Sequence, residues 1–443
     1  MKHPATKRSI AYSDALSTTV RDGGGLAGPS QSLGRSNGNG PATRNSRQQL
    51  GALVKIGESK AAAVDYHGAI ADFQQALKLA VNILKGEPSA IDVYKEKAST
   101  LVNMGRTQVI LAAHEEAIKC FSEAVDTCDQ ALQFAPDEFT FHNEKGKALL
   151  SLGRLMAVLA RPVEVDSNFA KAIESFEQAL KHASNDPQGS CDRAGILLSI
   201  GRLKAGLSES KKAFESYNKC LALTDEILQD ATDLTTPHTT KTSALASIGR
   251  LHASLSDHTE AIEFFNRALS SVDVALRKSP NDVAILSNKG TILLSRGQSQ
   301  VTLSQHQAAV DSFQSAIGVF DDILTLTLDN VTTFYNKANS LTRLGECQAF
   351  LTQPAEATES FEQAIVVFDE ALRRAPNYVH ARNSKGSALL NLGQLLFSSR
   401  FYVDALQTYH KALAEFSNSH GIAPGNDQIR SYKEQLEVIL EEW

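Results

Sequence analysis

Residues 245–276 read LASIGRLHASLSDHTEAIEFFNRALSSVDVAL, and the pattern of this stretch recurs along the chain every 48 residues. A leucine stands four residues before a repeated glycine, and an aromatic residue stands sixteen after it. The repeat glycines are Gly57, Gly105, Gly153, Gly201, Gly249, Gly297, Gly345 and Gly393. A period between about 20 and 50 residues is typical of stacked supersecondary units. The sequence therefore predicts eight repeats, and positions within a repeat are counted from its glycine.

Each repeat contains two apolar segments with helical spacing. In the first, apolar or small residues lie four and one before the glycine and four after it, as in Leu149, Leu152 and Ala157. In the second, they lie 12, 16, 19, 20, 23, 26 and 27 after it, as from Ala117 to Leu132. Steps of three and four describe one face of an α-helix. We therefore predict an all-α fold in which each repeat is a helical hairpin.

The glycine column predicts a close approach between the two helices of each hairpin. Glycine within a helix costs about 0.5–1 kcal/mol relative to alanine. Its presence in all eight repeats therefore indicates a packing requirement, because a side chain at this position would push the helices apart. Prolines such as Pro136 and Pro280 follow the second segment, where they cannot continue a helix.

The pattern divides the chain into three parts. Residues 1–45 are rich in Gly, Ser, Asn and Pro without an apolar period, which predicts a disordered basic tail. Residues 425–443 leave the period and predict a capping helix with a charged outer side, formed by Ile429, Tyr432, Leu436, Val438 and Leu440. Residues 46–424 form the predicted α-solenoid, with repeats at 46–88, 89–136, 137–184, 185–232, 233–280, 281–328, 329–376 and 377–424.

Charge separates the tail from the repeats. The tail through residue 47 has a net charge of +5, which leaves −11 for the remainder of a chain whose net charge is −6. This balance speaks against nucleic-acid binding by the repeats, although the tail could contact phosphates. No secretory signal core or membrane-spanning run occurs, and a flexible tail is favoured over a transit peptide. We expect a soluble, cytoplasmic protein whose five cysteines are reduced.

The repeat resembles the tetratricopeptide repeat in its Leu-x-x-[Leu/Ile]-Gly segment, its alanines, its aromatic residue and its closing proline. The copy with the closest resemblance contains Leu101, Met104, Gly105, Ala117, Phe121, Ala124 and Pro136. The family repeat has about 34 residues, and one added heptad in each helix accounts for the difference. The resemblance implies a superhelix whose first helices line a concave face. Position three after the glycine, often tyrosine in the family, varies here from Lys60 to Leu396.

Two charged columns keep the period, one acidic 24 residues after the glycine and one basic eight residues before it. Folding of successive helices would bring these columns opposite each other, so we predict a ladder of structural ion pairs in preference to a basic stripe for an acidic partner. The predicted pairs are Asp129–Lys145, Glu177–Arg193, Asp225–Lys241, Asp273–Lys289, Asp321–Lys337 and Asp369–Lys385.

The candidate partner-binding residues lie on the first helices of the repeats. Four consecutive repeats carry arginine just after the glycine, and guanidinium groups bind carboxylates bidentately. The alternative is a solvated helix face with local salt bridges. Small and polar columns flank the arginines, and the carboxylate clamp of the resembled family is not recognisable. The candidates are Arg106, Arg154, Arg202, Arg250, Asn143 and Asn339.

No segment predicts catalysis or cofactor binding. The sequence has no HExxH, phosphate-binding GxxxxGK[ST] or GxSxG motif and no metal-spaced cluster of Cys and His. We therefore expect no enzyme, no cofactor and no metal. Two hypotheses remain: a protein-binding scaffold or adaptor that holds a peptide or helix in its groove, and a structural repeat protein that self-associates. Nucleic-acid binding ranks third.

Overall fold

The computed structural model describes residues 41–62, 65–111, 113–159, 161–184, 186–230, 235–328, 330–422 and 426–441. Over these ranges the chain forms 17 α-helices and no strand, in consecutive helix–turn–helix hairpins. The predicted all-α solenoid is therefore confirmed. Of the tail predicted at 1–45, residues 1–40 lie outside the described residues. The first described helix begins at Pro41, so residues 41–45 of the predicted tail are helical.

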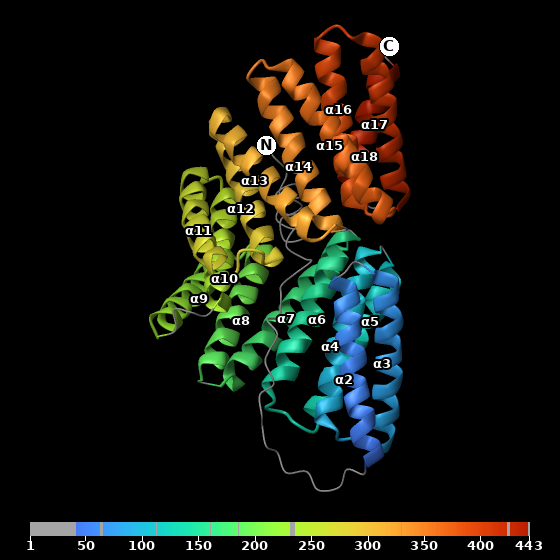
Figure 1. Ribbon diagram of the computed structural model, residues 1–443, viewed down its shortest axis with the longest axis vertical. Coiled ribbons are helices and arrows are strands. Elements are labelled where there is room, and N and C mark those ends of the chain that lie inside the picture. Colours follow the sequence, from blue (N-terminus) through green and yellow to red (C-terminus); the bar gives the residue numbers. More distant parts are fainter. Residues whose placement is uncertain are drawn as a thin grey trace. The chain divides into compact units, whose positions relative to one another are not determined.

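The chain divides into two compact units, Met1–Leu223 and Thr224–Trp443. The first helix of each hairpin is called the A helix and the second the B helix (Figure 1). Unit 1 contains α2 (Pro41–Ala62), α3 (Tyr66–Gly86), α4 (Ile91–Ile110), α5 (His114–Leu132), α6 (Phe139–Val158), α7 (Pro162–His182), α8 (Pro187–Gly206) and the first part of α9 (Ser210–Asp230).

Unit 2 contains the last part of α9 and four further hairpins, followed by one single helix. Its helices are α10 (Thr235–Ser254), α11 (His258–Lys278), α12 (Val283–Thr302), α13 (His306–Leu326), α14 (Val331–Phe350), α15 (Pro354–Arg374), α16 (Val379–Ser398), α17 (Tyr402–Ile422) and α18 (Asp427–Glu441). None of the helices in the described part of the chain is long and apolar enough to cross a membrane.

The repeat glycine lies against the aromatic ring of its own hairpin in all eight repeats. A Cβ atom placed on Gly297 would come within 2.5 Å of the Phe313 ring, and one on Gly345 within 2.9 Å of Phe361. Real Cβ atoms do not approach a ring this closely, so any larger residue would force the A and B helices apart. The predicted close approach at the glycine column is therefore confirmed.

A second contact of the same kind occurs one heptad further along both helices. Seven residues before the repeat glycine, Gly290 faces Phe320, and its added Cβ would lie 2.5 Å from that ring. Gly146 with Phe176 and Gly386 with Phe416 repeat the arrangement. A contact displaced by seven residues on each helix fits the predicted addition of one heptad, because seven residues return to nearly the same helix face.

The residue three after the repeat glycine varies between repeats, and its side chain contacts the residue fifteen after that glycine, on the B helix. The Ser312 hydroxyl donates to Gln300 Oε1 at 2.6 Å, and Ser360 donates to Gln348 in the same way. In the first repeat the same two positions form an ion pair, Lys60 Nζ to Asp72 Oδ2 at 2.6 Å. Local pairing of these positions explains why the first of them changes so freely between repeats.

Five A–B turns share one strained residue, seven after the glycine. Its φ is positive at Ser208, Ser256, Ser304, Thr352 and Arg400. The left-handed conformation ends the A helix and reverses the chain, as Ser304 N donates to the Val301 carbonyl and Gln305 N to the Gln300 carbonyl. The residue that follows is the N-cap of the B helix, as Gln305 is for α13.

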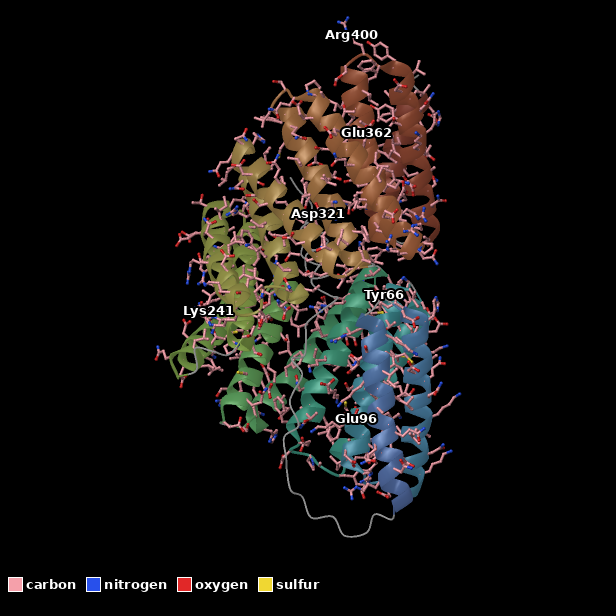
Figure 2. All side chains as sticks on the ribbon, in the orientation of Figure 1. Tyr66, Glu96, Lys241, Asp321, Glu362 and Arg400 are labelled. Atoms are coloured by element: carbon pink, nitrogen blue, oxygen red, sulfur yellow. The ribbon has the colours of Figure 1, made fainter. Side chains whose placement is uncertain are left out.

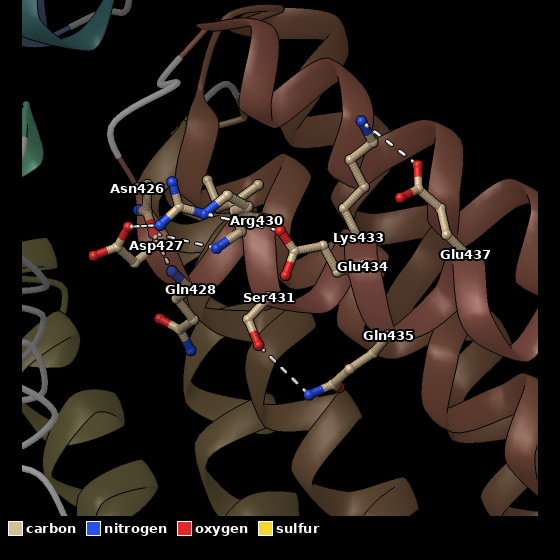
Figure 3. Close-up of polar contacts among 10 residues, drawn as sticks. Asn426, Asp427, Gln428, Arg430, Ser431, Lys433, Glu434, Gln435 and Glu437 are labelled. Atoms are coloured by element: carbon tan, nitrogen blue, oxygen red, sulfur yellow. Dashed lines mark hydrogen bonds and ion pairs between the residues drawn. The ribbon is translucent and has the colours of Figure 1, made fainter.

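The last helix, α18, closes the array at its C-terminal end. Ile429 and Leu436 are fully buried, and Leu436 packs in one cluster with Leu389 and Phe416. The outer side of α18 carries the Arg430–Glu434 and Lys433–Glu437 ion pairs (Figure 3). The predicted charged cap is therefore present, except that Val438 is exposed and does not belong to its apolar face.

The first A helix, α2, is polar on the side that later A helices bury. Within unit 1, Phe141 and Ile196 pack against the preceding B helix from positions 12 and five before the glycine. In α2 the corresponding side is exposed and consists of Asn45, Gln49, Ala52, Ile56 and Ser59. The array thus ends in a largely polar surface here as well, as solenoid ends require.

Candidate partner-binding surface

Successive A helices contact each other directly within each unit, as α4 and α6 do in unit 1 and α12 and α14 in unit 2. Asn103 on α4 donates to Glu58 on α2 at 2.9 Å, and Asn391 on α16 donates to Glu346 on α14 at 2.8 Å. The residue just after the glycine therefore faces the residue two before the next glycine. Positions nine, six and two before the glycine and one after it share one helix side, which we name the A face.

The A face differs in chemistry between the two units. In unit 2 it consists mostly of Ser, Thr, Asn and Gln, and two of its charged residues, Arg343 and Glu346, pair with each other at 2.8 Å. In unit 1 it is strongly charged, with Lys55, Glu58, Glu96, Arg106, Glu144, Lys147, Arg154, Asp192 and Arg202. The acidic members were not predicted from the sequence, because they lie beside the more regular basic column.

Three acids, Glu96, Glu144 and Asp192, occupy the same position on consecutive A helices of unit 1. Burial raises the pKa of the Glu96 carboxyl above its ordinary value, and the nearby Glu58 carboxylate raises it further. Burial likewise raises the pKa of Asp192, and Glu144 pairs with Lys147 at 2.8 Å. Glu96 is nevertheless exposed and labelled in Figure 2. Asp192 is half-buried and accepts from Gln188 at 3.2 Å, and Glu144 exposes 15% of its side chain, so Glu96 is the most accessible of the three carboxylates.

The arginine column is less accessible than the sequence predicted. Arg154 exposes only 8% of its surface, whereas Arg106, Arg202 and Arg250 are half-buried. Arg250 donates to Ser247 on its own helix at 3.2 Å. The physical reason is the direct contact between A helices, since the position after the glycine lies in that contact. Arg154 is thus buried between A helices, and the other three arginines of the predicted track are half-buried.

The two candidate asparagines lie on A helices and are half-buried. Asn143 is on α6 and Asn339 on α14, so they belong to different units. Within the described residues, no hydrogen bond of either side-chain amide is recorded, so both can donate to and accept from another molecule.

Five of the sequence-predicted ion pairs bring their charged atoms together, each joining a B helix to the next A helix. Lys145 Nζ lies 2.5 Å from Asp129 and Lys289 Nζ lies 2.9 Å from Asp273. The pairs Asp225–Lys241, Asp321–Lys337 and Asp369–Lys385 are each 2.6 Å apart. For the sixth pair, other contacts are recorded: Lys204 lies 3.9 Å from Glu177, and Arg193 donates to Ser190.

The last repeat extends the ladder into a buried cluster. Glu415 on α17 accepts from Lys385 at 2.7 Å and from Arg382 at 2.9 Å. Burial alone would lower the pKa of Lys385, but its hydrogen bonds to Asp369 and Glu415 hold that pKa above the ordinary value. This cluster joins α15, α16 and α17 and is structural, because its members contact one another.

The described residues contain no group of three or more His, Cys, Asp or Glu side chains placed to hold a metal ion. Burial raises the pKa of the Cys120 thiol, which donates to Gln108, to about 11. A thiol with this pKa is almost fully protonated near neutral pH and is a poor nucleophile.

Comparisons with solved structures find helical repeat proteins. The apo form of RapI is 11% identical over 90% of this chain and 99% of its own, with a TM-score of 0.48. BtubC from P. vanneervenii is 15% identical over 60% of this chain and 93% of its own, with a TM-score of 0.44. TTC0263, a tetratricopeptide repeat protein of Thermus thermophilus, is 19% identical over 55% of this chain and 99% of its own, with a TM-score of 0.32.

No curated protein matches the chain in sequence. A tetratricopeptide repeat family model matches residues 242–271, which span the end of α10 and most of α11. That segment contains Gly249 and Phe265, the pair that forms the glycine–aromatic contact of its hairpin. The seven other hairpins form the same contact at the same spacing. The chain is therefore a tetratricopeptide-like helical repeat protein with a repeat of 48 residues.

Proposed function

We propose that the chain is a non-enzymatic scaffold that binds a segment of another protein along its A face. The observation that carries this proposal is the acidic column of unit 1, Glu96, Glu144 and Asp192, in which Glu96 is exposed and the other two are half-buried. The B-helix contacts and the glycine–aromatic contacts that hold each hairpin together do not involve these side chains. Charges at one register on consecutive helices allow a single partner segment to make the same contact in successive repeats.

The remaining candidate residues contribute to the proposal in different degrees. Within unit 1, the half-buried Arg106 and Arg202 can reach a carboxylate of the partner, and Asn143 provides an amide for hydrogen bonds to its backbone. Arg250 and Asn339 lie in unit 2 and offer the same groups on that unit by itself. Arg154 is left out because it is buried among the A helices.

The polar character of both ends favours a scaffold over a protein that polymerises end to end. The exposed side of α2 carries Asn45, Gln49 and Ser59 where later repeats bury apolar groups. The outer side of α18 carries ion pairs such as Lys433–Glu437. End-to-end stacking of copies would bury these polar groups without replacing their contacts with water, which is unfavourable.

The experiment is affinity capture from native extract with wild type and the variant Glu96→Lys/Glu144→Lys/Asp192→Lys. Captured proteins are then purified, and their affinity for both forms is measured by calorimetry. We expect the variant to lose a partner that the wild type binds, since three contacts in register become repulsive.

The matched control reverses three exposed acids on B helices, in the variant Glu116→Lys/Asp126→Lys/Glu174→Lys. It changes the net charge equally and should keep the partner. Equal binding by both triple variants and wild type would show that the A face of unit 1 is not the binding surface.

A further inference from the structure

The turn between α16 and α17, residues 397–403, reads FSSRFYV and departs from the other turns of the array. Its residue with positive φ is Arg400, at 67°. Three earlier turns place a serine there, at Ser208, Ser256 and Ser304. A left-handed backbone is unfavourable for any residue that carries a Cβ atom, so this turn stores strain that glycine would reduce.

The same turn also lacks a side-chain helix cap, a property that it shares with the turns whose N-cap residues are Ala113, Gln305 and Gln353. Phe401 stands directly before α17, and its carbonyl accepts from Ala405 N, as expected of an N-cap residue. At the equivalent position Asp65 and Asp257 use their carboxylates to accept from backbone N–H groups of the following helix. A phenyl ring cannot accept these bonds, and replacing a good N-cap residue by an apolar one typically costs about 1 kcal/mol.

Phe401 is also 58% exposed, and further exposed apolar residues lie next to it in the sequence. The Phe397 and Tyr402 rings meet edge to face at 5.4 Å, and Val403 is exposed beside them. The Phe350 ring of the preceding hairpin is exposed too, but it stacks on His306 and is not part of this group. Exposed apolar residues gathered on one turn mark interaction sites, and aromatic residues with arginine are the commonest energetic centres of such sites.

Arg400 adds a single positive charge to this edge. Figure 2 shows it at the tip of the turn, beyond the ends of α16 and α17. Its guanidinium makes no recorded ion pair or hydrogen bond within the described residues. An arginine without an internal partner, placed beside exposed aromatic rings, can pair bidentately with a carboxylate from another molecule.

We propose that residues 397–403 form a docking site for a partner-protein segment that carries an acidic side chain next to an aromatic or aliphatic one. The carboxylate pairs with Arg400, and the apolar side chain packs on Phe401 and its neighbours. This site is separate from the A face and does not depend on it.

The test is selection from a displayed library of random peptides on the full wild-type chain, after depletion on Arg400→Glu/Phe401→Asp. Depletion removes every peptide that binds elsewhere, including the A face. We expect the remaining peptides to combine Asp or Glu with Phe, Trp or Leu, and to lose at least about tenfold in affinity for the variant. An empty selection, or one dominated by basic peptides, overturns the proposal.

The identity of the occupant is tested by sedimentation of wild type and variant. If wild type forms a dimer that the variant does not form, the occupant is a second copy and the proposal is wrong. Matched controls are Ser304→Gly and Gln305→Asp, which relax and cap the equivalent turn between α12 and α13. Both should keep the affinity of the selected peptides.

Thermal unfolding separates a binding role from a structural one. Arg400→Gly removes the left-handed strain and Phe401→Asp restores a cap, so each should raise the unfolding midpoint while weakening peptide binding. The controls should raise the midpoint and leave peptide binding unchanged. A lower midpoint for Arg400→Gly and Phe401→Asp would show that these side chains serve packing, and it would overturn the proposal.

Discussion

At the scale of single residues, the repeat glycine controls how closely the A and B helices approach. We predict that Gly297→Ala destabilises the chain by about 1–3 kcal/mol, because the new Cβ would lie 2.5 Å from the Phe313 ring. The measurement is urea unfolding followed by circular dichroism.

Gly318 on α13 provides the control for this substitution. A Cβ there meets no atom within 4 Å, so Gly318→Ala should stabilise the chain by about 0.5–1 kcal/mol through helix propensity alone. If both substitutions shifted the midpoint in the same direction, close packing would not be the reason for the glycine column.

Charged residues of the A face respond to pH according to their surroundings. Burial and Glu58 raise the pKa of Glu96 above its ordinary value of 4.5, so ionised Glu96 destabilises the folded state at neutral pH. We predict that Glu96→Gln is more stable than wild type at neutral pH and that the difference disappears as the pH falls to about 4. The control is Glu362→Gln on the exposed side of α15, which changes the net charge by the same amount.

The sequence predicts single residues well where contacts are local and poorly where they are not. The contact between Gly249 and Phe265 follows from spacing within one hairpin. The burial of Arg154 could not be predicted, because it depends on how closely the next A helix packs.

At the scale of helices, residues of complementary size pack against each other in the added heptad of the A and B helices. Positions seven before and 23 after the glycine combine as Gly290 with Phe320, but as Leu50 with Ala80 in the first repeat. All four residues are buried. A large residue on one helix is thus offset by a small one on the other, which keeps the total volume similar.

This compensation predicts strong coupling between the two positions. Gly290→Leu should destabilise the chain by overpacking, and Phe320→Ala should cost about 3–5 kcal/mol through the cavity it leaves. The double variant reproduces the pair of the first repeat and should be more stable than the sum of the single effects implies. Additive losses in urea unfolding would show that the two positions do not pack as one pair.

The ion pairs between hairpins should contribute according to their burial. Asp273 and Lys289 have side chains that are 50% and 29% exposed, so a double-mutant cycle with alanine should give a coupling of about 0–1 kcal/mol. Lys385 and Glu415 are only 13% and 14% exposed, and loss of either one leaves a buried charge. Their coupling should be the larger of the two. Equal couplings would mean that burial does not decide the strength of these pairs.

At the scale of the whole molecule, the period was enough to predict the class of fold and the number of hairpins. Eight glycines at a constant spacing of 48 residues identify the helical hairpin as the repeated unit. The division into two units at Leu223 was not predictable, since the repeat pattern runs through α9 without a break. The FSSRFYV turn was also missed, because its importance lies in departures from a backbone geometry that the sequence alone does not show.

The cap at the C-terminal end permits a test of how stability is distributed along the array. In repeat proteins each hairpin contacts only its neighbours, so a loss at one end should remain close to that end. Deletion of residues 426–443 removes Ile429 and Leu436 and uncovers Leu389 and Phe416. We predict faster amide exchange in α16 and α17, little change in α10 to α13, and association through the uncovered apolar surface. The opposite end provides the control, because Ile56→Ser on the exposed side of α2 uncovers nothing and should leave exchange and mass unchanged. Faster exchange throughout unit 2 after the deletion would mean that its hairpins unfold as one cooperative body, and nearest-neighbour stacking would then be the wrong description of its stability.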